Sequence, residues 1–151
     1  MKIDYSNAQI INSPNFYMHD DWFVNMNYEY KEKCMDSINI HLSKCYEVND
    51  YNVKFNNVIG FEGTSCRFWG LFQEKCINYI EFVKEEEQTL IPKLYELKKK
   101  EPNVNDSCPL LSNQKFIEIS IGFLNGDTLT IACESLEVDD DMVAYFPFRS
   151  K

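Results

Sequence analysis

The chain has 151 residues, a net charge of −9 and a hydrophobic share of 44%, with eleven Phe, nine Tyr and two Trp. This composition excludes a disordered chain and predicts a single domain with its own core, residues 1–151. The negative field repels phosphate backbones and anionic membranes, which argues against nucleic-acid and membrane partners. The N-terminus lacks the apolar stretch of a signal peptide, so we expect a cytoplasmic protein.

Cysteine and histidine usage argues against a metal site. The six cysteines form no Cys-x-x-Cys pair and the chain has only two histidines, so we predict no metal and no cofactor. A cytosolic chain of this size also needs no disulfides. We therefore interpret the cysteines as small core residues or free thiols.

The first half of the chain contains several stretches in which apolar and polar residues alternate, the period of strands with one buried face. After an extended lead-in with a short strand near residues 8–11, such stretches occupy residues 22–30, 38–42 and 51–55. The last two predict an antiparallel meander. At Asn56-Asn57 the apolar phase shifts by one, so a bulge there would carry the third strand on to Phe61.

The middle of the chain contains the one predicted helix. Residues 76–82 come first and predict a strand, with a helix as the alternative. Leucines then recur at helical spacing over residues 90–100, with acidic residues before them and lysines at the end, as the helix dipole favours. Pro92 is tolerated only in a first turn, so the helix should begin near Leu90 with Thr89 as its N-cap.

Residues 115–138 give the clearest structural signal, two alternating apolar segments joined at Asn125-Gly126. A two-residue loop would set the apolar face of one segment against the polar face of the other. A three-residue loop with Gly126 in the left-handed bulge position joins the two apolar faces, so a β-branched residue there should be strongly destabilising. The predicted cross-strand pairs are Ile121 with Leu129, Ile119 with Ile131, and Ile117 with Cys133.

These segments together predict an α+β fold. We expect a mostly antiparallel curled sheet or split barrel of six to eight strands, with one helix near residues 90–100 packed on it. Residues 102–113 are rich in Pro, Asn and Ser and predict a surface loop. Residues 142–148 predict an edge strand, where Pro147 is tolerated.

Acidic residues form two groups that no nearby bases balance. Such charge runs most often form a solvated face that keeps a protein soluble. The alternative is a docking surface that attracts a basic partner and speeds its association. The candidate partner-binding residues are Glu85, Glu86, Glu87, Glu134, Glu137, Asp139, Asp140 and Asp141.

His19, Asp20 and Asp21 place an imidazole beside two carboxylates, the groups that acid–base catalysis uses. Adjacent residues of an extended chain point to opposite faces, which argues against their convergence on one substrate. His41 alternates with apolar neighbours and should face solvent. The chain contains no nucleophile elbow, phosphate-binding glycine loop or zincin motif, and we assign no catalytic residues.

Short strand-and-turn motifs carry a resemblance to a known class of proteins. They are Asp20-Asp21-Trp22, Val53-x-Phe55-x-Asn57-Val58, Phe68-Trp69-Gly70, Leu124-Asn125-Gly126-Asp127 and Leu129-Thr130-Ile131-x-Cys133-Glu134. In these motifs the chain resembles small acidic bacterial proteins of unassigned function, some of them immunity proteins that neutralise secreted toxins. The resemblance implies a non-enzymatic protein, with a secreted toxin as the partner in some members of the class, and it transfers no site residues.

Three functional hypotheses follow from the sequence. The first is a non-enzymatic interaction protein, such as an immunity or inhibitor protein, that binds a basic partner through an acidic surface. The second is a small-molecule-binding sheet or barrel, which the many Phe and Tyr residues permit and a large apolar pocket would favour. The third is an enzyme that uses His19 with Asp20 or Asp21, which requires these side chains to converge in a cleft.

Overall fold

The computed structural model of the protein describes residues 1–14, 16, 18–31, 36–44, 50–64, 76–100 and 115–139. Several sequence predictions fall outside these residues and stay predictions. They concern the loop at residues 102–113, the edge strand at residues 142–148, the Phe68-Trp69-Gly70 motif, and Asp140 and Asp141.

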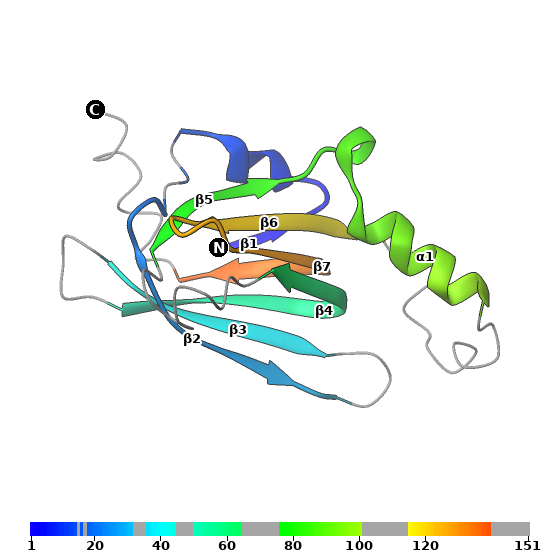
Figure 1. Ribbon diagram of the computed structural model, residues 1–151, viewed down its shortest axis with the longest axis horizontal. Helices are drawn as coiled ribbons and strands as arrows, with labels where there is room; N and C mark the ends of the chain where they lie inside the picture. Colours follow the sequence, from blue (N-terminus) through cyan, green and yellow to red (C-terminus); the bar gives the residue numbers. More distant parts are fainter. Residues whose placement is uncertain are drawn as a thin grey trace.

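The described residues form an open, mostly antiparallel sheet with one α-helix (Figure 1). The strands follow the order β2-β3-β4-β7-β6-β5, and β1 adds to β7. This arrangement confirms the predicted α+β class, and the sheet does not close into a barrel. In chain order the elements are β1 (Lys2–Asp4), the 3-10 helix η1 (Ala8–Asn12), β2 (Trp22–Glu29), β3 (Ser37–Ser43), β4 (Asp50–Thr64), β5 (Ile77–Phe82), the 3-10 helix η4 (Glu85–Glu87), α1 (Leu90–Lys100), β6 (Ile117–Phe123) and β7 (Thr128–Val138).

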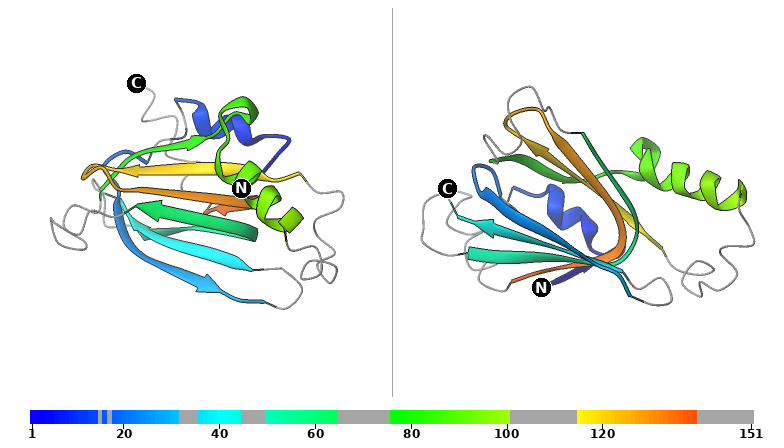
Figure 2. Two further views of the ribbon diagram at one scale, coloured as in Figure 1. Left: turned by 45° about the vertical axis from the view of Figure 1, so that its right-hand side comes forward. Right: turned by 60° about the horizontal axis from the view of Figure 1, so that its bottom comes forward.

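The sheet curls, and its two faces are covered differently (Figure 2). The concave face holds the main core, to which η1 contributes Ala8 and Ile11. The convex face carries α1, whose first turn packs on a second apolar cluster. The largest fully buried side chains of the main core are Tyr51, Phe55, Ile3, Ile11, Met18, Ile38, Ile40, Leu42, Ile77, Ile117, Ile119 and Ile131. The second cluster consists of Leu90, Ile91, Phe116 and Ala132.

The hairpin of β6 and β7 has the predicted register. Ile121 lies opposite Leu129, Ile119 opposite Ile131, and Ile117 opposite Cys133. In the turn, the Gly126 N–H donates to the Phe123 carbonyl at 3.0 Å, and Gly126 has a φ of +91°. The apolar faces of both strands therefore meet the same core, as the three-residue bulged loop requires.

Bulges let the long strands bend around the core. Asn57 in β4 has a φ of +51°, and Val58 is buried in the same core as Phe55, which confirms the predicted phase shift at Asn56-Asn57. The register of β2 with β3 also shifts, between Phe23 and Asn25. Each bulge strengthens the local twist, so the sheet becomes curled rather than flat.

Of three local predictions, one is wrong and two are confirmed. The predicted strand near residues 8–11 is wrong, because these residues form the 3-10 helix η1. The strand predicted at residues 76–82 is confirmed as β5, and the helical alternative is excluded. The predicted helix is confirmed and begins at Leu90, with Pro92 in its first turn.

Thr89 is at the N-cap position, because its carbonyl accepts the Lys93 N–H at 3.3 Å, but the carboxylate of Glu118 accepts the free N–H groups of the first turn of α1. The Glu118 side chain is on β6 but is 1% exposed, because the start of α1 covers it. The carboxylate accepts the backbone N–H groups of Thr89 and Leu90 at 3.2 Å each and that of Ile91 at 3.0 Å. The Glu118 backbone carbonyl accepts the N–H of Val83 at 2.9 Å. One strand residue thus holds both ends of the segment between β5 and α1.

Replacing Gly126 by Val should lower the free energy of unfolding by about 1–3 kcal/mol, the cost of forcing a non-glycine residue into a positive φ. Nothing lies within 4 Å of the position that a Cβ would occupy, so strain alone causes the loss. Urea denaturation measures the effect. A Gly126→Asn control should lose less, because Asn tolerates this conformation. An unchanged urea midpoint for the Val variant would contradict the bulged turn.

Replacing Glu118 by Ala should destabilise the fold by at least about 2 kcal/mol, because it removes a helix cap and leaves buried N–H donors without an acceptor. A Glu118→Gln variant keeps one acceptor oxygen and the size of the side chain, so its loss should be smaller. Urea denaturation followed by circular dichroism compares the three proteins. Equal stability of the Ala variant and the wild type would rule out a capping role for this carboxylate.

Candidate functional site

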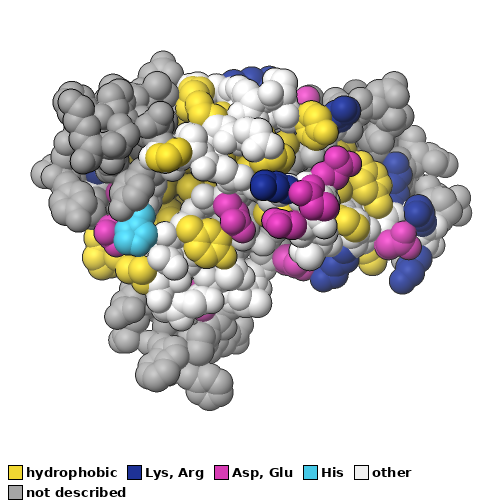
Figure 3. All heavy atoms as spheres, turned by 90° about the horizontal axis from the view of Figure 1, so that it is seen from above, with side chains coloured by type: hydrophobic (Ala, Val, Ile, Leu, Met, Phe, Trp, Pro, Cys, Tyr) yellow, Lys and Arg dark blue, Asp and Glu magenta, His cyan; other side chains and the backbone are white. Residues whose placement is uncertain are grey.

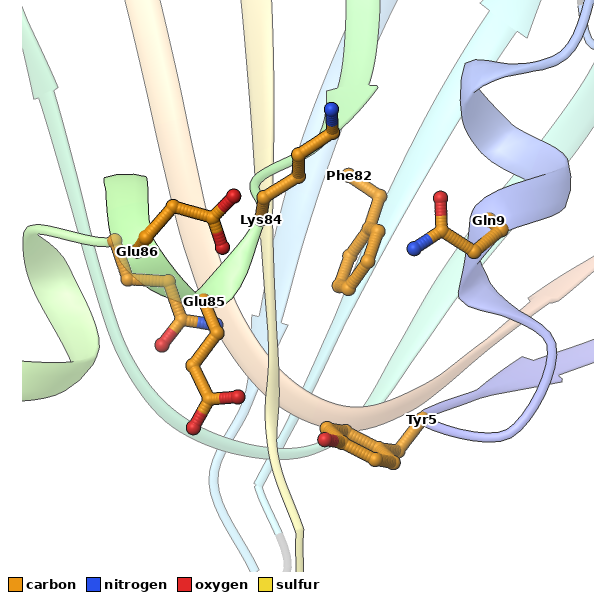
Figure 4. A pocket seen from close by; sticks show the side chains of 7 residues that line it. Tyr5, Gln9, Phe82, Lys84, Glu85 and Glu86 are labelled. Carbon is orange, nitrogen blue, oxygen red and sulfur yellow. The ribbon is translucent and has the colours of Figure 1, made fainter.

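A groove of about 370 Å³ lies where η1, the end of β5 and η4 meet. The ring of Phe82 lies between Gln9 of η1 and Glu85 of η4, and Tyr5 lies at one end (Figure 4). We call it the acidic groove. Its lining residues are Tyr5, Gln9, Phe82, Lys84, Glu85, Glu86 and Gln88.

The η1 wall of the acidic groove is fixed by Asn12. Its side-chain carbonyl accepts the Phe82 N–H at 2.8 Å, and its amide nitrogen donates to the Phe82 carbonyl at 2.9 Å. The Asn12 side chain thus takes the place of a neighbouring strand at this edge of β5. The two hydrogen bonds hold η1, and with it Gln9, beside Phe82.

Tyr5 is placed by a compact turn after β1. The Asp4 carboxylate accepts the Ser6 N–H at 2.9 Å and the Ser6 hydroxyl at 2.6 Å, and the Asn7 side chain accepts the Asp4 N–H at 2.8 Å. The hydroxyl of Ser6 lowers the pKa of Asp4, because its hydrogen bond favours the ionised carboxylate. The ring of Tyr5 also holds a cation, since the Lys115 Nζ lies 4.5 Å from the ring centroid.

The acidic wall of the groove is η4. The Lys84 carbonyl accepts the Glu87 N–H at 2.8 Å, which closes the 3-10 turn. Glu85, Glu86 and Glu87 are exposed, and their carboxylates form no ion pair with any residue that the structure describes. The ammonium group of Lys84 points away from the carboxylate of Glu85 (Figure 4). Acidic side chains gather around a single basic one on the face that carries η1, β5 and η4 (Figure 3).

The acidic residues of β7 are not part of the groove lining. Glu134 accepts a hydrogen bond from the Asn57 amide, and Glu137 accepts one from Asn56 at 3.3 Å. Asp139 accepts the backbone N–H of Asn52 at 2.9 Å. All three carboxylates therefore bind β4, the neighbouring strand. Among the described residues of the predicted acidic surface, Glu85 and Glu86 are the ones that line the groove.

The side chains of the predicted His19-Asp20-Asp21 triplet lie in two different environments. His19 Nδ1 lies 3.0 Å from Asp20 Oδ2, and both side chains are more than a third exposed. Asp21 is fully buried and accepts the Tyr51 hydroxyl at 2.5 Å. Asp20 has a φ of +71°, which turns the chain between these two environments. Only the first two residues of the triplet are close enough to act together, and neither lines the groove.

His41 lies on the convex face of β3, as predicted, while Ile40 is buried. Its ring nitrogens contact Asn52 Oδ1 at 3.1 Å and Asp50 Oδ2 at 3.0 Å, both on β4. The bond with Asn52 and then the bond with Asp50 raise the pKa of His41, and nearby Asp139 adds to the effect. This cluster ties β3 to β4.

The lining of the acidic groove combines two aromatic rings, two carboxylates and two amides with the one basic side chain of Lys84. Rings, carboxylates and amide oxygens are groups that can contact an ammonium or guanidinium group. The described part of the chain contains no cluster of three His, Cys, Asp or Glu side chains suited to a metal ion, and Cys133 is a buried free thiol. Four of the six cysteines lie outside the described residues.

Comparisons with known proteins add no homologue. No family model, curated protein or solved structure matches the chain. Among the described residues, no helix is long and apolar enough to cross a membrane. The geometry of the groove and the charge of the chain are therefore the features that bear on function.

The His41 cluster should make stability depend on pH. Because the pKa of His41 is raised in the folded state, its stabilising contribution is complete below the unfolded value of 6.5 and is lost as pH rises through the folded value. The difference in urea midpoint between the wild type and a His41→Gln variant should therefore shrink from about pH 5 to about pH 9. A difference that stays constant over this range would contradict the assignment.

Proposed function

We propose that the protein is a non-enzymatic interaction protein that binds a basic partner, and that the acidic groove receives a lysine or arginine side chain of that partner. One observation carries the proposal: the carboxylate-bearing side chains of Glu85 and Glu86 line the same groove as the rings of Tyr5 and Phe82. Exposed carboxylates alone attract cations weakly. When they border an aromatic cleft, the rings also bury the apolar stem of the lysine or arginine side chain.

The contact between Lys115 and Tyr5 supports this chemistry. A lysine ammonium already lies 4.5 Å from the centroid of the Tyr5 ring, within the usual range of a cation–π interaction. The ring thus has a face suited to a cation. Phe82 offers a second ring at the centre of the groove, with 9% of its surface exposed.

The charge of the whole chain supports the same class of partner. A net charge of −9 attracts a basic protein over a distance of about one Debye length, ~8–10 Å at moderate salt. The resemblance to toxin-immunity proteins makes a basic toxin, met in the cytoplasm, the specific partner that we propose. Such a protein would act by occupying its partner rather than by catalysis.

Charge reversal in the groove tests the proposal. A Glu85→Lys, Glu86→Lys double variant should bind a lysine-rich peptide at least about tenfold more weakly, because two charge-assisted contacts are lost. The matched control is Glu137→Lys with Asp139→Lys, which makes the same charge change at the C-terminal end of β7, outside the groove lining. Fluorescence anisotropy with a labelled peptide gives the affinities, and pull-downs from native cytosol compare the proteins captured.

The outcome separates a groove from a general charge effect. Equal weakening by both double variants would show that net charge alone attracts the peptide and would reject the groove. Binding that neither reversal nor added salt changes would reject the electrostatic proposal as a whole. Thermal melts of both variants establish that each remains folded.

A further inference from the structure

The two edges of the sheet differ in how their backbone groups are satisfied. At the β5 edge, Asn12 binds both backbone groups of Phe82. At the other end of β5, the Ile77 N–H donates to the Asp21 carbonyl at 2.9 Å, and the Ile77 carbonyl accepts the Asp20 N–H at 2.8 Å. This edge is therefore closed to another strand at both of its ends.

The β2 edge is open by comparison. Within the part of the chain that the structure describes, β2 pairs with β3 on one side, and on the other side only Trp22 has a partner, in a bridge with Cys76. The regular part of β2 begins after the register shift, at Asn25, and ends at Glu29. A strand edge of this kind presents a row of N–H and C=O groups that another strand can bind.

Apolar side chains alternate with polar ones along this edge, and all of them are exposed from Val24 to Glu29. Met26 and Tyr28 lie opposite the buried Ile40 and Ile38 and are 36% and 47% exposed. Phe61 of β4 is 46% exposed, and its ring centroid lies 5.7 Å from that of Tyr28. We call Met26, Tyr28 and Phe61 the β2 strip. Exposed apolar groups that gather beside an open edge mark an interaction surface more strongly than either feature alone.

We propose that β2 pairs antiparallel with β2 of a second copy of this chain, across a two-fold axis at Asn27. Asn27 is the centre of the regular segment Asn25–Glu29. The axis places Asn27 opposite its own copy, Met26 opposite Tyr28, and Asn25 opposite Glu29. Apolar residues therefore meet apolar residues, and each Glu29 carboxylate meets an amide donor rather than another acid.

Charge favours a second copy over a basic partner as the occupant of this edge. Glu29 is the one charged residue of β2, although the chain as a whole carries −9. A surface selected for a basic partner would place several acids along the edge, as η4 does along the groove. A self-complementary strand with a single charge, which faces an amide in the pairing, instead lets two like-charged copies meet where their repulsion is small.

Sedimentation velocity of the full chain over a dilution series tests the proposal. The wild type should form dimers, and added salt should strengthen them, because salt screens the repulsion between two acidic copies. Asn27→Lys places two lysines opposite each other across the axis, and Met26→Lys removes an apolar pair. Each should weaken the dimer at least about tenfold, equal to ~1.4 kcal/mol.

Asn78→Lys is the matched control, because Asn78 is an exposed residue of β5, at the closed edge. It makes the same charge change and should leave the dimer intact. If a β2 variant fails to fold, hydrogen exchange of the wild type replaces it. The amides of residues 25–29 should then be protected more strongly as the protein concentration rises.

Several results would overturn the proposal. They are a wild type that remains monomeric at every concentration, an Asn27→Lys protein that dimerises as well as the wild type, and amide protection that does not depend on concentration. Protection of the β2 amides only after a lysine-rich peptide is added would assign the edge to a different partner. Because salt weakens binding of a basic partner and strengthens this dimer, failure here leaves the groove proposal standing.

Discussion

The position of the candidate site depends on one buried carboxylate. A charge at the position of Glu118 would be costly without compensation, and the structure compensates it with three backbone N–H groups at the positive end of the α1 dipole. The same residue's carbonyl binds Val83, before η4. The segment that forms the acidic wall of the groove is therefore fixed at both of its ends by hydrogen bonds to Glu118 of the sheet. A short 3-10 helix with no buried residue of its own gains a fixed place in this way.

The curl of the sheet creates both surfaces to which a function is assigned. Bulges in β2 and β4 bend the strands around the concave core, which leaves an edge at each end of the sheet order. At the β5 edge, Asn12 replaces a strand, and the 3-10 helices gathered there form the groove. At the β2 edge, no such cap occurs among the described residues. The two edges thus differ in what binds their outward-facing backbone groups: a side chain at the β5 edge and, in our proposal, a second copy of the chain at the β2 edge.

Features determined by local chemistry could be predicted from the sequence, and those determined by tertiary contacts could not. Gly126 and Pro92 restrict the backbone directly, so the hairpin register and the start of the helix followed from them. Glu118 alternates with buried isoleucines, which is the pattern of a solvent-facing residue. Its burial could not be predicted, because nothing nearby in the sequence indicates that α1 covers it. Only the acidic part of the groove could be predicted from the sequence, because its glutamates form a charge run. Tyr5 and Phe82 come together through contacts between distant segments, which the sequence does not indicate.

Because the acidic groove and the β2 strip have no residue in common, a dimer formed through β2 could still bind a partner at each groove. The groove is lined by residues near η1, β5 and η4, and the β2 strip by residues of β2 and β4, so pairing through β2 would use none of the residues that line the groove. A dimer would then present two cation-binding grooves related by a two-fold axis. A partner with two basic sites at a matching distance would bind such a dimer far more tightly than a single groove, because the second contact forms at a high effective concentration. Self-association through β2 would thus strengthen recognition by the charged groove without adding any contact to it.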